Sequence, residues 1–247
     1  MSRTMWVILI HICSLLVMMD ALGHAEVEMV FPDKHGNVEI TGAGGVSRIG
    51  TVTGCVEGSG KEQQEVRPTI PFSRVLIDGA FTVKIEFQQE SKLVIRGDDN
   101  ILPYIVTEVS DSLLTIRANR SICTKGSLVV EISTEQLKQL TADGANDITI
   151  SKLKNREFSV VVDGTSDIRI SGETKKFLLK VDGAGTVQAK DLHAEEAEVL
   201  IDGAGEAEVY AARKLIAEID GAGDIRYYGN PDELKTKIDG AGDIESQ

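Results

Sequence analysis

The pentapeptides VDGAG at residues 181–185 and IDGAG at residues 201–205, 219–223 and 238–242 repeat one motif along the C-terminal half of the chain. An Asp-Gly dipeptide followed by a small residue occurs at Asp78, Asp143, Asp163, Asp182, Asp202, Asp220 and Asp239. From Asp143 onward, successive copies are 20, 19, 20, 18 and 19 residues apart. Repetition at a nearly fixed period is typical of solenoid proteins, in which each repeat forms one rung.

Apolar and polar residues alternate on both sides of each Asp-Gly. The residues just before the Asp are Ala142, Val162, Val181, Ile201, Ile219 and Ile238. Beyond the motif, the equivalent apolar positions hold Ile148, Ile168, Val187, Ala207, Ile225 and Ile244. Alternation with period two is typical of a strand with one buried face. Each repeat therefore predicts a strand, a DGAG corner, a second strand and a looser polar turn.

The residues of the corner have a chemical rationale. An Asp side chain can accept a hydrogen bond from a backbone N–H two residues on, and Gly tolerates a positive φ. We therefore expect each Asp to cap its own corner. Because a unit of this length cannot bury its apolar face alone, the units are expected to stack at about 4.8 Å per rung. The sequence predicts an all-β fold, a right-handed β-solenoid (β-helix) of roughly 19-residue rungs with DGAG corners, in preference to an antiparallel meander.

Residues 1–25 have the pattern of a secretory signal peptide. Arg3 gives a positive start, an apolar run extends from Met5 to Met19, and the small residues Gly23 and Ala25 fit a cleavage site. The apolar run is too short to cross a bilayer comfortably, so we expect cleavage and no membrane-spanning segment after it. The chain is therefore expected to be exported, to the periplasm, the cell surface or the medium.

The chain after residue 25 divides into two parts by composition. Residues 26–68 form a Gly-rich leader that we expect to be partly ordered, and residues 69–247 form the β-solenoid domain. Cys55 and Cys123 could pair in an oxidising compartment. Their spacing in the sequence does not decide whether they lie within bonding distance.

The net charge of −13 opposes phosphate backbones, so nucleic acid is not expected as a partner. His35 and His193 lack the spacing of a zinc site or a catalytic triad, and the chain has no GxSxG or Walker motif. We therefore expect no catalytic, cofactor-binding or metal-binding residues, and no enzyme.

Stacked rungs would align acidic side chains in two rows. The first row is the Asp of each DGAG corner; the second contains Asp147, Asp167, Glu206, Asp224 and Asp243, interrupted at Thr186. Carboxylates about 4.8 Å apart repel by roughly 1 kcal/mol in water. Either backbone N–H groups at the corners or calcium ions between rungs could offset this repulsion. The long period and the interrupted second row favour capping over calcium.

Three further stretches resemble a known family. PFSRVLIDGAFTVKIE from Pro71, IRGDDNILPYIVTEVSDSLLTI from Ile95 and RYYGNPDELKTKIDGAGDI from Arg226 are similar to the head GIN domain, a bacterial family of putative autotransporter adhesin heads. The resemblance extends from about Thr69 to Ile244. It implies an extracytoplasmic β-helical domain of undetermined molecular function, and it supplies no catalytic residues.

These observations favour a non-enzymatic binding or adhesion-type module at the cell envelope. Its ligand is expected to be a surface glycan or protein, and Tyr210, Tyr227 and Tyr228 are the few aromatic residues suited to glycan contact. Two alternatives stay open, a structural envelope component without a ligand and a carbohydrate-active β-helix enzyme. We also expect the C-terminal rung to support self-association, because an uncovered solenoid end offers unpaired strand groups.

Overall fold

The structure is a computed structural model that describes residues 39–42, 45–48, 54–87 and 90–247. The chain divides into two compact units, residues 1–55 and 56–247. In the first unit, strands β1 (Glu39–Gly42) and β2 (Gly45–Arg48) form an antiparallel pair. The expected signal peptide, and the leader outside these two strands as far as residue 53, lie outside the described residues.

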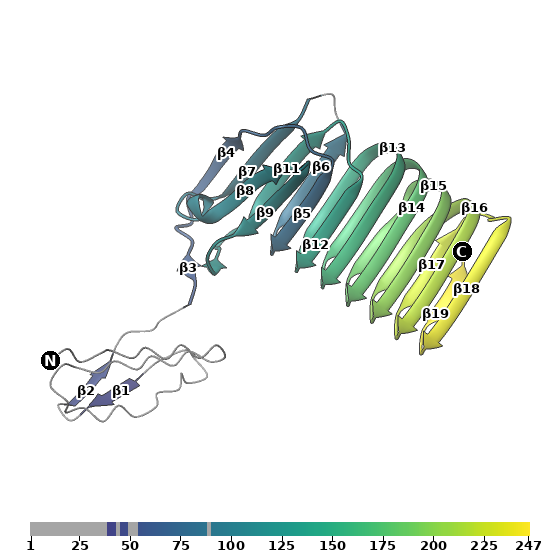
Figure 1. Ribbon diagram of the computed structural model, residues 1–247. Helices are drawn as coiled ribbons and strands as arrows, with labels where there is room; N and C mark the ends of the chain where they lie inside the picture. The colour runs from purple at the N-terminus through teal and green to yellow at the C-terminus, as the bar shows by residue number, and fades with distance from the viewer. Residues whose placement is uncertain (1–38, 43–44, 49–53, 88–89) are drawn as a thin grey trace, which may run out of the picture. The chain divides into compact units, whose positions relative to one another are not determined.

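The second unit consists almost entirely of β-strands (Figure 1). Its strands are β3 (Val56–Glu57), β4 (Glu62–Arg67), β5 (Arg74–Gly79), β6 (Thr82–Phe87), β7 (Lys92–Asp98), β8 (Ile105–Ser110), β9 (Leu113–Ala118), β10 (Ile122–Cys123), β11 (Val129–Thr134), β12 (Gln139–Gly144), β13 (Asp147–Gly164), β14 (Asp167–Gly183), β15 (Thr186–Gly203), β16 (Glu206–Gly221), β17 (Asp224–Tyr228), β18 (Glu233–Gly240) and β19 (Asp243–Ser246). One short 3-10 helix, η1 (Leu102–Tyr104), precedes β8.

The strands form a β-solenoid of about five turns. The strands that lead into each Asp-Gly, here called sheet 1, are β5, β12, the second halves of β13 to β16, and β18. The strands that follow it, here called sheet 2, are β6, the first halves of β13 to β16, β17 and β19. Each of the long strands β13 to β16 therefore contributes to both sheets, and the chain turns between them within the strand.

Successive rungs pair in parallel, with equivalent residues side by side. Asp78, Asp143, Asp163, Asp182, Asp202, Asp220 and Asp239 form one continuous row in the strand register. The rungs of this region therefore stack in one direction, as the repeat predicts, and do not form an antiparallel meander.

The core lies between the two sheets and is built from the alternating apolar positions. In sheet 1, Val162, Val181, Ile201 and Ile219 are at most 1% exposed on successive rungs, and in sheet 2 Ile148 and Ile168 are buried in the same way. The rings of Phe158 and Phe177 stack with centroids 6.2 Å apart. Because each rung buries its apolar side chains against its neighbours, the stack is stabilised rung by rung.

Backbone hydrogen bonds between rungs close the corners, and the prediction that each Asp side chain caps its own corner is wrong. Each corner Gly has a positive φ. From Gly144 onward, the residue after it donates its N–H to the carbonyl oxygen of the corner Gly on the preceding rung, as Ala204 does to Gly183 at 2.8 Å. The corner Asp side chains, such as that of Asp202, are exposed and accept no hydrogen bond from the N–H groups of their own corner among the described residues. Rung-to-rung bonding therefore replaces the local cap, since the stacked neighbour offers a carbonyl to the N–H that the Asp was expected to cap.

The N-terminal end of the solenoid is covered by antiparallel strands. In sheet 1, β9 pairs in parallel with β5 and antiparallel with β8. In sheet 2, β11 pairs in parallel with β6 and antiparallel with β7, which in turn pairs with β4. Residues 56–67, which belong to the expected leader, thus lie in the second compact unit.

Cys55 and Cys123 are both disulfide-bonded. Strand β3, which begins directly after Cys55, pairs in parallel with β10, which ends at Cys123. A disulfide is consistent with an oxidising compartment. Within the described residues, no helix has the length and apolar character needed to cross a membrane.

Candidate binding site

The looser turns between the two sheets form a groove that crosses four rungs. Its volume is about 430 Å³, and it is lined by Lys154, Asn155, Glu173, Thr174, Lys175, His193, Ala194, Glu195, Tyr210 and Ala212. We call this hollow the turn groove. It lies on the side of each rung remote from the Asp-Gly corner, because it follows the point where β13 to β16 pass from sheet 2 to sheet 1.

The turn groove has a floor of short side chains and a wall of longer ones. The register places Asn155, Thr174, Ala194 and Ala211 in one row, and Lys154, Glu173, His193 and Tyr210 in the adjacent row. The side chains of the first row are mostly buried, whereas Lys154, Glu173 and His193 are exposed. Short residues between long ones leave a trough, which explains why the hollow is here.

Hydrogen bonds fix the polar part of the floor. The Thr174 hydroxyl donates to Asn155 Oδ1 at 2.8 Å, and Asn155 Nδ2 donates to the carbonyl oxygen of Leu137 at 2.7 Å. Across the mouth of the groove, Lys175 and Glu195 form an ion pair at 3.7 Å. The groove therefore has a preformed floor and a charge-balanced rim.

An aromatic pair occupies one end of the groove. The rings of His193 and Tyr210 pack edge to face, with centroids 4.7 Å apart and planes at 74°. The row continues to Tyr228, and Lys190 lies 5.8 Å from the centroid of that ring. The hydrogen bond to Glu208 and its charge, at 3.0 Å, raise the pKa of Lys190.

The aromatic pair lies where the rungs differ in length. Ala189 pairs with Val209, but the next paired residues are His193 and Tyr210, so three residues of β15 have no counterpart in β16. The loose turn absorbs this difference, while the register at the corners stays constant. The turn groove is thus a locally distinct feature in an otherwise regular stack. The sequence indicated Tyr210 as a candidate; His193 and the groove itself were missed, because they depend on how unequal turns align.

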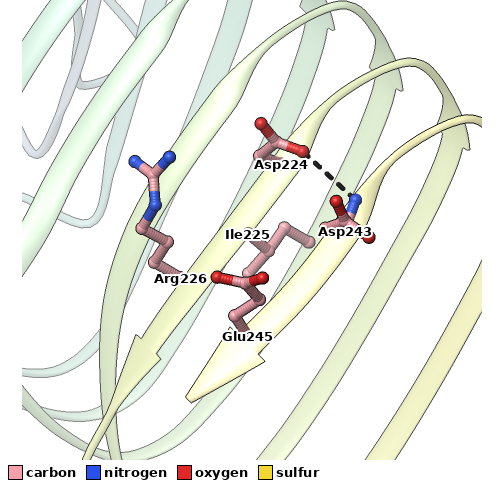
Figure 2. A pocket seen from close by; sticks show the side chains of 5 residues that line it. All are labelled: Asp224, Ile225, Arg226, Asp243 and Glu245. Carbon is pink, nitrogen blue, oxygen red and sulfur yellow. Dashed lines mark hydrogen bonds between the residues drawn. The ribbon is translucent and has the colours of Figure 1, made fainter. Parts of the chain in front are cut away.

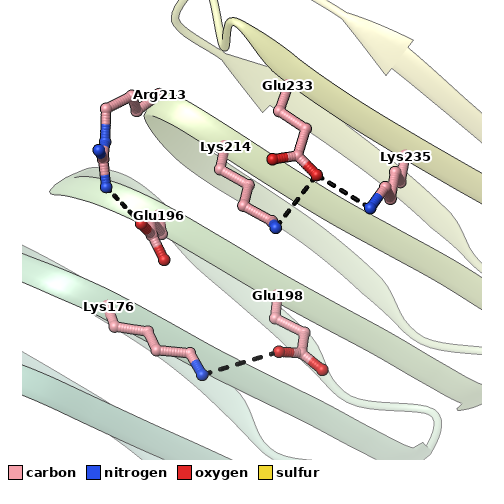
Figure 3. A network of polar contacts seen from close by, with 7 residues as sticks. All are labelled: Lys176, Glu196, Glu198, Arg213, Lys214, Glu233 and Lys235. Atoms are coloured by element: carbon pink, nitrogen blue, oxygen red, sulfur yellow. Dashed lines mark hydrogen bonds and ion pairs between the residues drawn. The ribbon is translucent and has the colours of Figure 1, made fainter.

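Charged side chains on the outer face of sheet 1 form ion pairs with one another. Ion pairs link neighbouring rungs, including Lys176 with Glu198 at 4.0 Å and Arg213 with Glu196 (Figure 3). Hydrogen bonds from Lys235 and Lys214 hold the pKa of Glu233 below its usual range. Exposed pairs of this kind contribute little to stability individually, but they leave this face with few unpaired charges for a partner.

The two acidic rows lie in register along the corner and the start of sheet 2. In the second row, Thr186 interrupts the series between Asp167 and Glu206, as expected. At its C-terminal end, a small hollow of about 110 Å³ is lined by Asp224, Ile225, Arg226, Asp243 and Glu245, and the N–H of Asp243 donates to Asp224 Oδ1 at 3.1 Å (Figure 2). Within the described residues, no three His, Cys, Asp or Glu side chains converge as a metal site requires.

Residues 71–231 match the family described as "Putative auto-transporter adhesin, head GIN domain". This chain belongs to the head GIN domain family. The turn groove lies within the matched residues, so it is part of the head GIN domain and not an appendage to it.

Solved structures share the head GIN fold of this chain at low sequence identity. A putative adhesin from Bacteroides fragilis is 20% identical, with a TM-score of 0.66, and the match covers 78% of this chain and 100% of that one. A putative lipid binding protein from Parabacteroides distasonis (21% identity, TM-score 0.52, 78% and 99% covered) and a putative adhesin from Parabacteroides merdae (20%, 0.51, 78% and 98%) are also similar. No protein with a curated function matches the chain.

The GDDN motif of this head GIN domain has a structural role. Asp98 is 6% exposed; its Oδ1 accepts a hydrogen bond from Gly60 N at 2.7 Å and its Oδ2 accepts one from Lys125 N at 3.2 Å. Asp99 accepts a hydrogen bond from the Ser59 hydroxyl at 2.5 Å. The motif clamps the loop between β3 and β4.

Proposed function

We propose that this head GIN domain is a non-enzymatic binding module of the adhesion type, exported to the cell envelope. The turn groove carries the proposal, because it combines an accessible aromatic pair with hydrogen-bonding groups on a rigid stack. Ligand sites are typically concave and largely preformed, with a few placed polar groups. Family membership, and the adhesin names of similar structures, support the same role.

Export is proposed from the signal-peptide pattern of residues 1–25 and from the disulfide-bonded cysteines. Expression in a Gram-negative host followed by fractionation and N-terminal mass spectrometry tests it. We expect a chain that begins at Glu26 outside the cytoplasm. An uncleaved chain in the cytoplasm would contradict export.

The binding role is tested by a screen of the labelled chain against intact bacterial cells, envelope polysaccharides and host surface proteins. We expect saturable binding to a defined surface component, with no release of reducing sugar ends over hours. Release of new reducing ends would instead support a carbohydrate-active enzyme. A complete lack of saturable binding would favour a structural component without a ligand.

Self-association through the C-terminal rung is a second proposed property. Leu234 and Ile238 on β18 are 46% and 45% exposed, whereas Leu215 and Ile219, their register partners on β16, are fully buried. In the described chain β18 pairs only with β16, so its other edge offers strand hydrogen bonds to a second copy. We expect light scattering to show concentration-dependent dimers that Ile238→Lys abolishes; a strict monomer at high concentration contradicts this property.

A further inference from the structure

The shape of the turn groove selects an elongated ligand. Its lining comes from four successive rungs, β13 to β16, so it extends across three strand spacings of about 4.8 Å each. The floor row runs straight across the rungs, since equivalent residues are in register there. A linear chain lying across the rungs would contact every wall residue, whereas a compact molecule would contact only one or two.

The groups around the groove suit a ligand rich in hydroxyls. Lys154 and Lys175 supply donors, Glu173 and Glu195 supply acceptors, and His193 can supply either. Two ammonium groups and two carboxylates balance one another. The groove therefore gives no net attraction to a polyanion, and the chain as a whole, at −13, opposes one.

The aromatic pair supplies a platform of limited size, formed by an exposed His193 and a half-buried Tyr210 that both line the groove. The face of an aromatic ring is electron-rich and attracts the weakly positive C–H groups of a ligand. On the next rung, Gly229 with φ +94° leaves room beside the pair, because a Cβ there would lie 3.4 Å from the Tyr210 ring and 2.4 Å from Ala211 O. Because His193 and Tyr210 both line the groove, a ligand in it can reach the pair.

A protein partner fits this groove less well. The central part of a protein–protein contact is typically depleted in charged residues, whereas charged side chains line this groove on successive rungs. A sugar chain needs both features found here, a ring for its C–H face and alternating donors and acceptors for its hydroxyls. As a step that rests on the proposed binding function, we propose that the turn groove binds a neutral, extended oligosaccharide, with one sugar ring stacked on the His193–Tyr210 pair.

The test is a titration of the full chain with neutral hexasaccharides of glucose and of N-acetylglucosamine. Calorimetry measures the affinity, and NMR of the imidazole signals locates the binding. The chain has 4 histidines, so the His193 signal is identified by its loss in His193→Gln, and the affinity tag must contain no histidine. We expect a hexasaccharide to shift the His193 signal. Tyr210→Ala should weaken binding about tenfold, which is the upper range for loss of one ring contact.

Two variants control for folding. Tyr104→Ala removes a ring of similar exposure that lies far from the groove, against Arg120, and should leave the affinity unchanged. Tyr210→Phe keeps the ring and should retain most of the affinity. Each variant is compared with the wild type by thermal unfolding, so a loss of binding caused by misfolding is recognised.

Three outcomes decide the proposal. Sugar binding that neither shifts His193 nor responds to Tyr210→Ala would place the sugar elsewhere and overturn the groove as its site. Binding to cells that survives enzymatic deglycosylation but not protease treatment would identify a protein ligand; it would overturn the sugar assignment and leave the proposed binding function intact. Binding to neither sugars nor cells would overturn both.

Discussion

The backbone N–H of Ala222 donates a hydrogen bond to the carbonyl oxygen of Gly203, on the preceding rung, at 2.7 Å. Gly221, the residue directly before Ala222, has φ +144°, and a Cβ on it would lie 2.3 Å from that same carbonyl oxygen. The corner therefore requires glycine for two independent reasons, its positive φ and the close approach of the neighbouring rung.

Gly221→Ala should destabilise the protein by about 2–4 kcal/mol, because the new methyl group would push the rungs apart at the corner. Ala222→Ser, at the exposed neighbouring position, is the matched control and should change stability by less than about 0.5 kcal/mol. Urea unfolding followed by circular dichroism measures both. Equal midpoints for the two variants would contradict this description of the corner.

Ile219 and Ile238 test the solenoid register as a pair, since they are side by side on successive rungs. Ile219 is fully buried, so Ile219→Asp should cost several kcal/mol, about 4 or more, for burial of an unpaired charge. Ile238 is 45% exposed, and Ile238→Asp should cost much less. An unchanged melting temperature for Ile219→Asp would mean that the register is wrong.

The strand pairing of the repeat region could be predicted from the sequence, and that of β4, β7 and β11 could not. Ile201 and Ile219 lie at the same distance from their Asp-Gly and alternate with polar residues. The sequence therefore indicated both the repeat period and the strand register. Strand β7 has no such repeat and pairs antiparallel with β4 and β11, which are distant in sequence. Strands β8 and β9, by contrast, form a local hairpin across Asp111 and Ser112.

The chemistry of the corner and of the groove was also beyond sequence reasoning. An isolated Asp-Gly turn would use the Asp side chain as a cap, but in a stack the carbonyl of Gly183 reaches the N–H of Ala204 first. The aromatic end of the groove arises because β15 and β16 differ in length at the turn, which brings His193 beside Tyr210. Neither relationship exists within a single repeat.

Asp98 provides a test of the GDDN clamp. The buried Asp98 carboxylate accepts hydrogen bonds from the backbone N–H groups of Gly60 and Lys125. Asp98→Ala removes both and should lower the free energy of unfolding by about 2 kcal/mol. Asp99→Ala removes one exposed hydrogen bond to Ser59 and serves as the control, with an expected cost below about 0.5 kcal/mol. Differential scanning calorimetry compares the two. A smaller loss for Asp98→Ala than for Asp99→Ala would show that the clamp is not stabilising.

Calcium should have little effect on the stability of the acidic rows. Thr186 interrupts the second row, and within the described residues no cluster of three potential ligands is formed. A native-state site would add about 2.7 kcal/mol at a calcium concentration one hundred times its Kd. Thermal unfolding in EDTA and in millimolar calcium, at matched ionic strength, should therefore give closely similar melting temperatures. A large rise in melting temperature that is specific to calcium would contradict this expectation and identify the Asp rows as metal sites.

The most direct measurement of the proposed binding role is competition on intact cells. Fluorescently labelled chain is bound to cells from the screen and displaced by unlabelled wild type, Tyr210→Ala or Tyr104→Ala. We expect saturable binding that wild type and Tyr104→Ala displace equally well, while Tyr210→Ala requires about tenfold more protein. Binding that does not saturate, or that unlabelled wild type fails to displace, would contradict it.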